Sequence, residues 1–198
     1  RNSALPSIND VKKRYSISFD NYGIILFHPV TTEFSKTKSY TNSIIRCSIK
    51  SKKKFVVIYP NNDPGNNEIL KLYKLKLKNN KNFKLLKSMR FEYFLTLLKN
   101  SNLILGNSSA GIIEAPVYGI PTINLGTRQN KRVKKINSIL NLDFESNNLI
   151  KKINYLYGKK FKRKFIFGDG SSAKKITNIL KSKIIWKTPV QKSFNDKN

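Results

Sequence analysis

The sequence is poor in metal-binding and redox-active side chains, with one cysteine and one histidine among its 198 residues. Cys47 cannot form a disulfide within the chain, which is typical of a reducing compartment, so we expect a cytoplasmic protein. One histidine and one cysteine cannot supply the common zinc ligand sets, and the dinucleotide-binding pattern Gly-x-Gly-x-x-Gly is absent. The composition therefore predicts neither a metal site nor a bound cofactor.

Long apolar runs are also lacking. No stretch of about 18 apolar residues occurs, which argues against a membrane span, and no secretory signal opens the chain. The sequence begins with Arg1 rather than methionine, and its opening residues resemble a linker. We therefore expect a piece of a longer protein with no membrane partner, in which residues 1–21 form a linker and a short helix that follow an N-terminal domain.

Acidic residues are scarce: 11 Asp and Glu stand against 39 Lys and Arg, for a formal net charge of +28. Such a charge is compatible with nucleic-acid binding. The lysines, however, are scattered beside asparagines in several separate stretches, namely residues 52–54, 74–81, 131–135 and 159–164. This pattern favours a solvated surface and no specific nucleic-acid partner. A nucleic-acid-binding module and a local field that attracts a small anion remain the alternatives.

Short apolar runs alternate with amphipathic segments through most of the chain. Buried strands are predicted at residues 23–28, 55–59, 83–86, 103–106 and 121–125. Helices are predicted from Glu33, capped by Thr31 or Thr32, to about Lys50, and at about 67–78, 91–98, 146–157 (capped by Ser146) and 173–180. This order is typical of an α/β fold, a Rossmann-like parallel sheet with helices on both faces. We expect it to occupy residues 22–185, followed by a tail at 186–198.

The stretch from Leu103 to Arg132 contains the clearest functional pattern. An apolar strand runs into Gly106-Asn-Ser-Ser109, a helix follows and ends at Gly119, and a second apolar run begins at Pro121. Such a turn lies outside the carboxyl ends of parallel strands, where these sheets bind ligands. Backbone N–H groups at the helix start, with two hydroxyls beside them, form a natural anion site. We therefore predict a phosphate-binding turn.

Five motifs occur in order along the chain. They are His28-Pro-Val-Thr-Thr-Glu33, Tyr59-Pro-Asn-Asn-Asp-Pro-Gly65, Gly106-Asn-Ser-Ser-Ala-Gly-Ile-Ile-Glu114, Asn124-Leu-Gly-Thr-Arg-Gln129 and Gly168-Asp-Gly170. Together they resemble the C-terminal domain of the UDP-N-acetylglucosamine 2-epimerases, most closely the hydrolysing type of sialic-acid biosynthesis. The resemblance covers about residues 23–185 and implies the C-terminal half of a GT-B-type epimerase. The sequence departs from the family at Lys131, where glycine is usual, and at Ser171 and Ser172, which precede Ala173.

The resemblance assigns expected roles to residues of the central motif. Ser108 and Ser109 match the serines that contact phosphate in the family, whereas alone they could be a simple N-cap pair. Glu114 matches a glutamate that accepts hydrogen bonds from the ribose diol. The sequence places Glu114 about one and a half turns into the helix, where it could also be an ordinary exposed residue.

Basic residues are expected near the diphosphate. His28 matches the strand-end histidine of the family and is the catalytic candidate, with a structural histidine bonded to a turn as the alternative. Arg128 and Arg132 follow a predicted strand, where guanidinium groups could pair bidentately with a diphosphate.

Three further residues complete the expected substrate site. Phe94 matches an aromatic position that stacks on the base in related proteins, although it also fits the apolar face of its helix. Asn61 and Asp63 could line the same cleft or form an Asx turn. Asp169, flanked by glycines, is expected to be structural.

The resemblance implies a reaction and partners. UDP would be eliminated from UDP-N-acetylglucosamine as C2 of the sugar loses a proton, and water addition would release N-acetylmannosamine and UDP. The N-terminal domain would supply acidic catalytic groups, so this chain alone should be inactive. Family members commonly form dimers, which implies a homodimer. Another nucleotide sugar, such as a GDP-linked diacetamido sugar, remains an alternative substrate.

Overall fold

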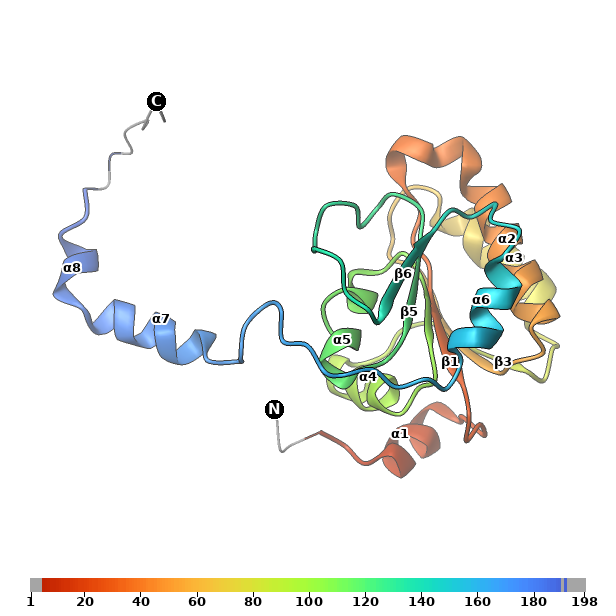
Figure 1. Cartoon of the computed structure of the whole chain (residues 1–198), viewed down its shortest axis with the longest axis horizontal. Coiled ribbons are helices and arrows are strands. Elements are labelled where there is room, and N and C mark those ends of the chain that lie inside the picture. The colour runs from red at the N-terminus through yellow and green to blue at the C-terminus, as the bar shows by residue number, and fades with distance from the viewer. Residues whose placement is uncertain (1–4, 190, 192–198) are drawn as a thin grey trace. The chain divides into compact units, whose positions relative to one another are not determined.

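The computed structural model describes residues 5–189 and residue 191 (Figure 1). Contacts within the chain divide it into two units, one reaching to Lys164 and one starting at Phe165. The first unit contains the sheet and all the strands found among the described residues. The second contains α7 (Ser172–Lys181) and α8 (Lys183–Trp186).

The first unit is built on one parallel sheet of six strands in the order β3-β2-β1-β4-β5-β6. The strands are β1 (Gly23–Leu26), β2 (Phe55–Ile58), β3 (Phe83–Leu86), β4 (Ile104–Gly106), β5 (Thr122–Leu125) and β6 (Ile139–Leu142). The strand order reverses between β1 and β4, and crevices for ligands form at such a reversal, outside the carboxyl ends of the strands.

Helices cover both faces of this sheet (Figure 1). One layer contains α2 (Thr37–Lys50), α3 (Asn66–Leu77) and α6 (Leu149–Leu156); the other contains α1 (Ile8–Tyr15), α4 (Phe91–Lys99) and α5 (Ala115–Tyr118). Neighbouring strand residues enter opposite cores: Ile25 packs in the first layer and Ile24 in the second. Burial on both faces explains the continuous apolar runs of the central strands. The predicted fold class is confirmed.

Two local predictions were wrong, and one strand, β6, was not predicted. Residues Thr31–Lys36 form a 3-10 helix, η1, whose N-cap is Val30 with no capping side chain, so neither threonine caps α2. Likewise α6 has Asn148, not Ser146, at its N-cap position.

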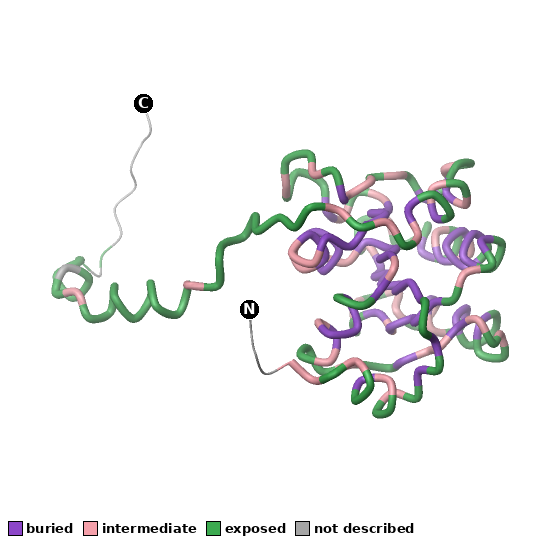
Figure 2. The backbone as a smooth tube through the Cα atoms, turned by 60° about the horizontal axis from the view of Figure 1, so that its bottom comes forward, coloured by how far each residue is buried: buried purple, intermediate pink, exposed green. Residues whose placement is uncertain are grey.

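The backbone is buried along the sheet and on the inner sides of the helices, whereas the outer surface is exposed (Figure 2). Most of the lysine stretches noted above occupy exposed positions. Across the residues that the structure describes, no helix has the length and apolar character required to cross a bilayer.

Candidate functional site

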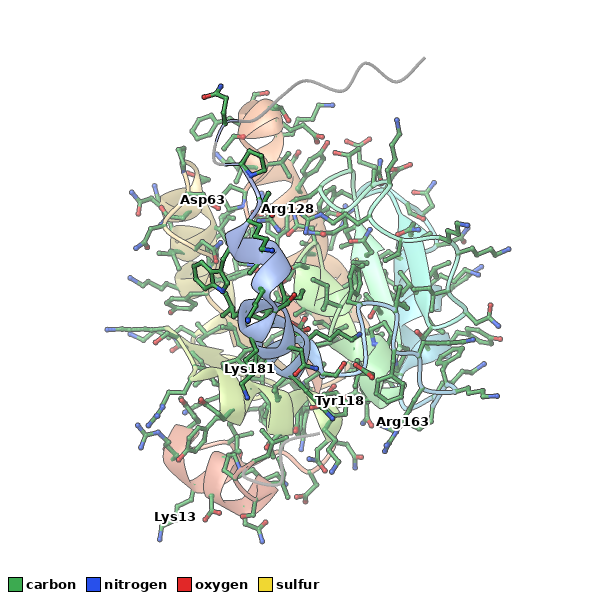
Figure 3. The ribbon with its side chains drawn as sticks, turned by 90° about the vertical axis from the view of Figure 1, so that its left-hand side faces the viewer. Lys13, Asp63, Tyr118, Arg128, Arg163 and Lys181 are labelled. Carbon is green, nitrogen blue, oxygen red and sulfur yellow. The ribbon has the colours of Figure 1, made fainter. Side chains whose placement is uncertain are left out.

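The site is assembled from loops that follow the carboxyl ends of four strands. His28 follows β1, Asn61 follows β2, Ser108 follows β4 and Arg128 follows β5. Parallel strands bring these ends to one edge, and in Figure 3 Asp63 and Arg128 lie toward the same end of the sheet. The sheet topology therefore gathers segments that are up to 100 residues apart in sequence.

A cavity of about 520 Å³ opens at this edge. Six of the predicted site residues line it, namely His28, Asn61, Phe94, Ser108, Ser109 and Glu114. The loop between β3 and α4 adds Lys87, Ser88 and Met89, and α4 adds Phe91. The cavity thus has a polar wall around the serine turn and a more apolar wall on α4.

Gly106 allows the serine turn to lie close against β1. Its φ is +139°, and an added Cβ would lie 2.0 Å from the carbonyl oxygen of Leu26. After this glycine the chain forms η2 (Ser109–Gly111), with Ser108 as its N-cap. The Ser108 hydroxyl accepts a hydrogen bond from Ala110 N at 3.3 Å, so it acts as a cap while also facing the cavity.

Glu114 lies immediately before α5 as its N-cap residue, not inside a continuous helix as predicted. Its carboxylate is half-buried, and its Oε2 is buried without a hydrogen-bond partner. Burial raises the pKa of Glu114 above its usual value. A buried acceptor without a partner is costly, and Glu114 lines the cavity, so its carboxylate is suited to receive donor groups from a ligand.

His28 is buried, and its position is fixed by hydrogen bonds. Its backbone N donates to Asn107 Oδ1 and its carbonyl oxygen accepts from Asn107 Nδ2, both at 2.8 Å. Its ring Nδ1 accepts from Asn61 N at 3.2 Å, which places the proton of the neutral ring on Nε2. Burial, with a smaller contribution from Arg128, lowers the pKa of His28 to about 4, while Asp63 opposes the shift. The ring is therefore a neutral donor at physiological pH.

The loop after β5 contacts the backbone of Asn107, the residue that precedes the serine turn. Arg128 Nη1 donates to the carbonyl oxygen of Asn107 at 3.2 Å, and Gln129 Nε2 donates to the same oxygen at 2.8 Å. Arg128 is half-buried and does not line the cavity, but its charge acts on His28. Arg132 is exposed and outside the cavity.

Asp63 is close enough to His28 to influence its pKa, yet it does not line the cavity either. Its carbonyl oxygen accepts from Asn66 N at 3.1 Å in the turn before α3. Among the residues that the structure describes, no three His, Cys, Asp or Glu side chains are grouped to hold a metal ion.

Sequence reasoning assigned no role to Asn107 or Gln129, which are 0% and 3% exposed. Both belong to quoted motifs, and a polar amide directly after a buried strand is a usable signal. Their partners, however, lie on other loops and are visible only in three dimensions. The cavity residues Phe91 and Lys87 were also missed.

A family model described as UDP-N-acetylglucosamine 2-epimerase matches residues 2–181. The chain belongs to this family. A UDP-N-acetylglucosamine 2-epimerase from Neisseria meningitidis serogroup B is 39% identical over 200 residues, which cover 99% of this chain and 52% of the relative. A hydrolysing UDP-N,N'-diacetylbacillosamine 2-epimerase from Legionella pneumophila is 27% identical over 160 residues, covering 80% of this chain and 42% of the relative.

Solved structures of epimerases share the fold. The UDP-GlcNAc 2-epimerase of Methanocaldococcus jannaschii, in complex with UDP-GlcNAc and UDP, has a TM-score of 0.68 at 24% identity, covering 86% of this chain and 48% of that one. The chain thus spans about half the length of the epimerases that it matches.

Proposed function

We propose that this chain is the nucleotide-binding half of a hydrolysing UDP-N-acetylglucosamine 2-epimerase. The observation that carries the proposal is Glu114, which lines the cavity together with Ser108 and His28 and whose buried Oε2 has no hydrogen-bond partner. A carboxylate with one unpaired oxygen, beside a turn of backbone N–H groups, suits a ribose diol linked to a diphosphate. The epimerase relative from Neisseria supports the same substrate class.

In this proposal the diphosphate lies on the serine turn, and the nucleoside extends along α4 with Phe94 near the base. Arg128 is held next to the serine turn by its hydrogen bond to Asn107. Its positive charge stabilises the negative charge that develops on the diphosphate as UDP departs. His28 acts as a neutral Nε2–H donor because its Nδ1 is already engaged by Asn61 N. A neutral donor can bond to the leaving diphosphate or the sugar without giving up a proton in the ground state.

The remaining chemistry belongs to an N-terminal domain. Its acidic groups remove the proton at C2 of the sugar, UDP leaves, and water adds to the unsaturated intermediate to give N-acetylmannosamine. We therefore propose that the isolated chain binds UDP but releases no N-acetylmannosamine, and that the complete protein is a homodimer. Detectable N-acetylmannosamine release by the isolated chain would refute the first part.

Titration calorimetry of the chain with UDP and GDP tests the nucleotide site. We expect saturable UDP binding that Glu114→Ala weakens by about 1 to 3 kcal/mol, the cost of leaving ribose hydroxyls unpaired. Glu92→Ala is the matched control, since Glu92 is exposed on α4 and outside the cavity. Equal losses in the two variants would contradict the assignment. Preference for GDP would retain the family and change the substrate to a GDP-linked sugar.

The same titration with a short DNA duplex at two salt concentrations tests the rival from another class. A nucleic-acid-binding module driven by the +28 charge requires affinity that falls steeply with salt and does not depend on Glu114. Salt-sensitive DNA binding without any mononucleotide heat would favour that rival.

A further inference from the structure

The side chain of Asn107 continues the pairing of β1 with β4 after the backbone ladder ends. The ladder reaches Leu26 opposite Gly106, and Asn107 N then donates to the Leu26 carbonyl at 3.1 Å. At the next position the chain turns away into the serine turn. The amide of Asn107 bonds both the N–H and the carbonyl of His28, as a neighbouring strand would.

The backbone carbonyl oxygen of Asn107 binds a third segment of the site, the loop after β5. It accepts from Arg128 Nη1 at 3.2 Å and from Gln129 Nε2 at 2.8 Å. Each of the four polar atoms of Asn107 therefore makes at least one hydrogen bond, and the residue is fully buried. Three loops that are distant in sequence meet on this one residue.

We infer that Asn107 is a positioning residue, which fixes the ring of His28, the serine turn and Arg128 relative to one another. The inference deepens the proposed function and rests on it for the identity of the ligand. Asparagine suits the task because its short side chain carries one acceptor and one donor in a plane. Aspartate lacks the donor when ionised, and alanine lacks both groups.

The arrangement also explains how His28 keeps its tautomer. With its backbone held on both sides by Asn107, the ring meets Asn61 N through Nδ1. Without that support the backbone of His28 would have two buried polar groups unpaired, and it would shift or admit water. The ring would then lose the contact that keeps its proton on Nε2.

The test uses the ring nitrogens of His28 as the readout. Because the chain has one histidine, a ¹⁵N–¹H correlation spectrum of its imidazole reports on His28 alone. We expect the Nε2–H tautomer in the native chain and a mixed tautomer population in Asn107→Ala, with a smaller change in Asn107→Asp. UDP affinity, measured in parallel, should fall by about tenfold or more in Asn107→Ala.

Asn124→Ala is the matched control. Asn124 is a buried asparagine opposite Gly106 on β5, and its Nδ2 donates to Asn141 Oδ1 at 2.8 Å. It should lower the melting temperature without moving the ring signals of His28, which separates positioning from general destabilisation. If Asn107→Ala does not fold, the tautomer of His28 is measured in Asn107→Asp instead. This variant has the same side-chain shape and keeps the acceptor for His28 N.

The two proposals fail in different ways. Native ring signals in a folded Asn107 variant would overturn the positioning role, whether or not UDP binds. Absence of UDP binding by the native chain would overturn the proposed function, while the tautomer of His28 would still report on Asn107.

Discussion

The hydroxyl of Thr127 donates a hydrogen bond of 2.7 Å to Oε1 of Glu33, joining the loop after β5 to the 3-10 helix after β1. The other carboxylate oxygen, Oε2, accepts from the Tyr40 hydroxyl at 2.9 Å. Since Thr127 precedes Arg128, this carboxylate anchors the loop that carries the arginine. Glu33 belongs to the motif that begins at His28, and this contact gives its last residue a structural role.

Glu33→Gln should therefore destabilise the protein in a pH-dependent way. The hydrogen bonds from Thr127 and Tyr40 lower the pKa of Glu33. A carboxyl whose folded-state pKa is depressed stabilises the fold above its unfolded-state pKa, and the effect is lost as pH falls through the folded-state value. We expect a loss of about 1 kcal/mol at neutral pH, limited by solvent screening. Urea unfolding at a series of pH values checks this. A deficit that does not shrink in acid, or that Glu92→Gln reproduces, would contradict it.

His28 should remain neutral well below pH 6. Its pKa is lowered from 6.5 to about 4, chiefly by burial and then by Arg128. Between these values the unfolded chain binds a proton that the folded chain does not, so stability should fall as pH drops from 6.5 toward 4. NMR titration of the ring gives the folded-state value, and His28→Gln should remove this part of the pH dependence. A midpoint near 6.5 would show that the ring is solvated.

Gly106→Ala should be among the most destabilising single substitutions in the sheet. The new Cβ would lie 2.0 Å from the Leu26 carbonyl oxygen at a residue with φ of +139°. We expect a loss of at least about 3 kcal/mol in free energy of unfolding, or failure to fold. Gly158→Ala is the control, because Gly158 has φ of +86° but nothing within 4 Å of the added Cβ. Similar losses for both variants would mean that strain, not the close approach of β1 and β4, sets the cost.

Arg128 and Arg132 should differ in their effect on UDP affinity. Arg128 is half-buried and bonded to Asn107, whereas Arg132 is exposed. Arg128→Ala should weaken binding by about tenfold or more, and Arg132→Ala by less than about threefold, as expected for a screened surface charge. Calorimetry of both variants at one ionic strength measures the difference. Equal losses would place Arg132 on the ligand.

The strands most easily predicted were those buried on both faces. β1 and β2 lie within continuous apolar runs, predicted at residues 23–28 and 55–59, and the predicted ends are within two residues of those observed. β6 escaped prediction because it is an edge strand with partly exposed residues, Ile-Leu-Asn-Leu, which does not produce a continuous apolar run. Its place in the sheet depends on pairing with β5, which local sequence does not encode.

The same distinction applies to the site. The sequence predicted which loops would meet, because parallel strands end at one edge of a sheet, and six predicted residues do line one cavity. The sequence did not predict the hydrogen bonds that join these loops to one another. Asn107 acts on His28 across 79 residues of sequence, and Thr127 acts on Glu33 across 94. Such contacts require the folded geometry.

The amide proton of His28 is held by the side chain of Asn107 and not by the backbone of a neighbouring strand. Its exchange with deuterated solvent therefore requires only that one side chain rotates away, while the strands on either side stay paired. Exchange at His28 should report local opening of the ligand edge, and exchange at Ile24 or Ile104 should report separation of the sheet. A ligand that rests on the serine turn would slow the first process and leave the second unchanged.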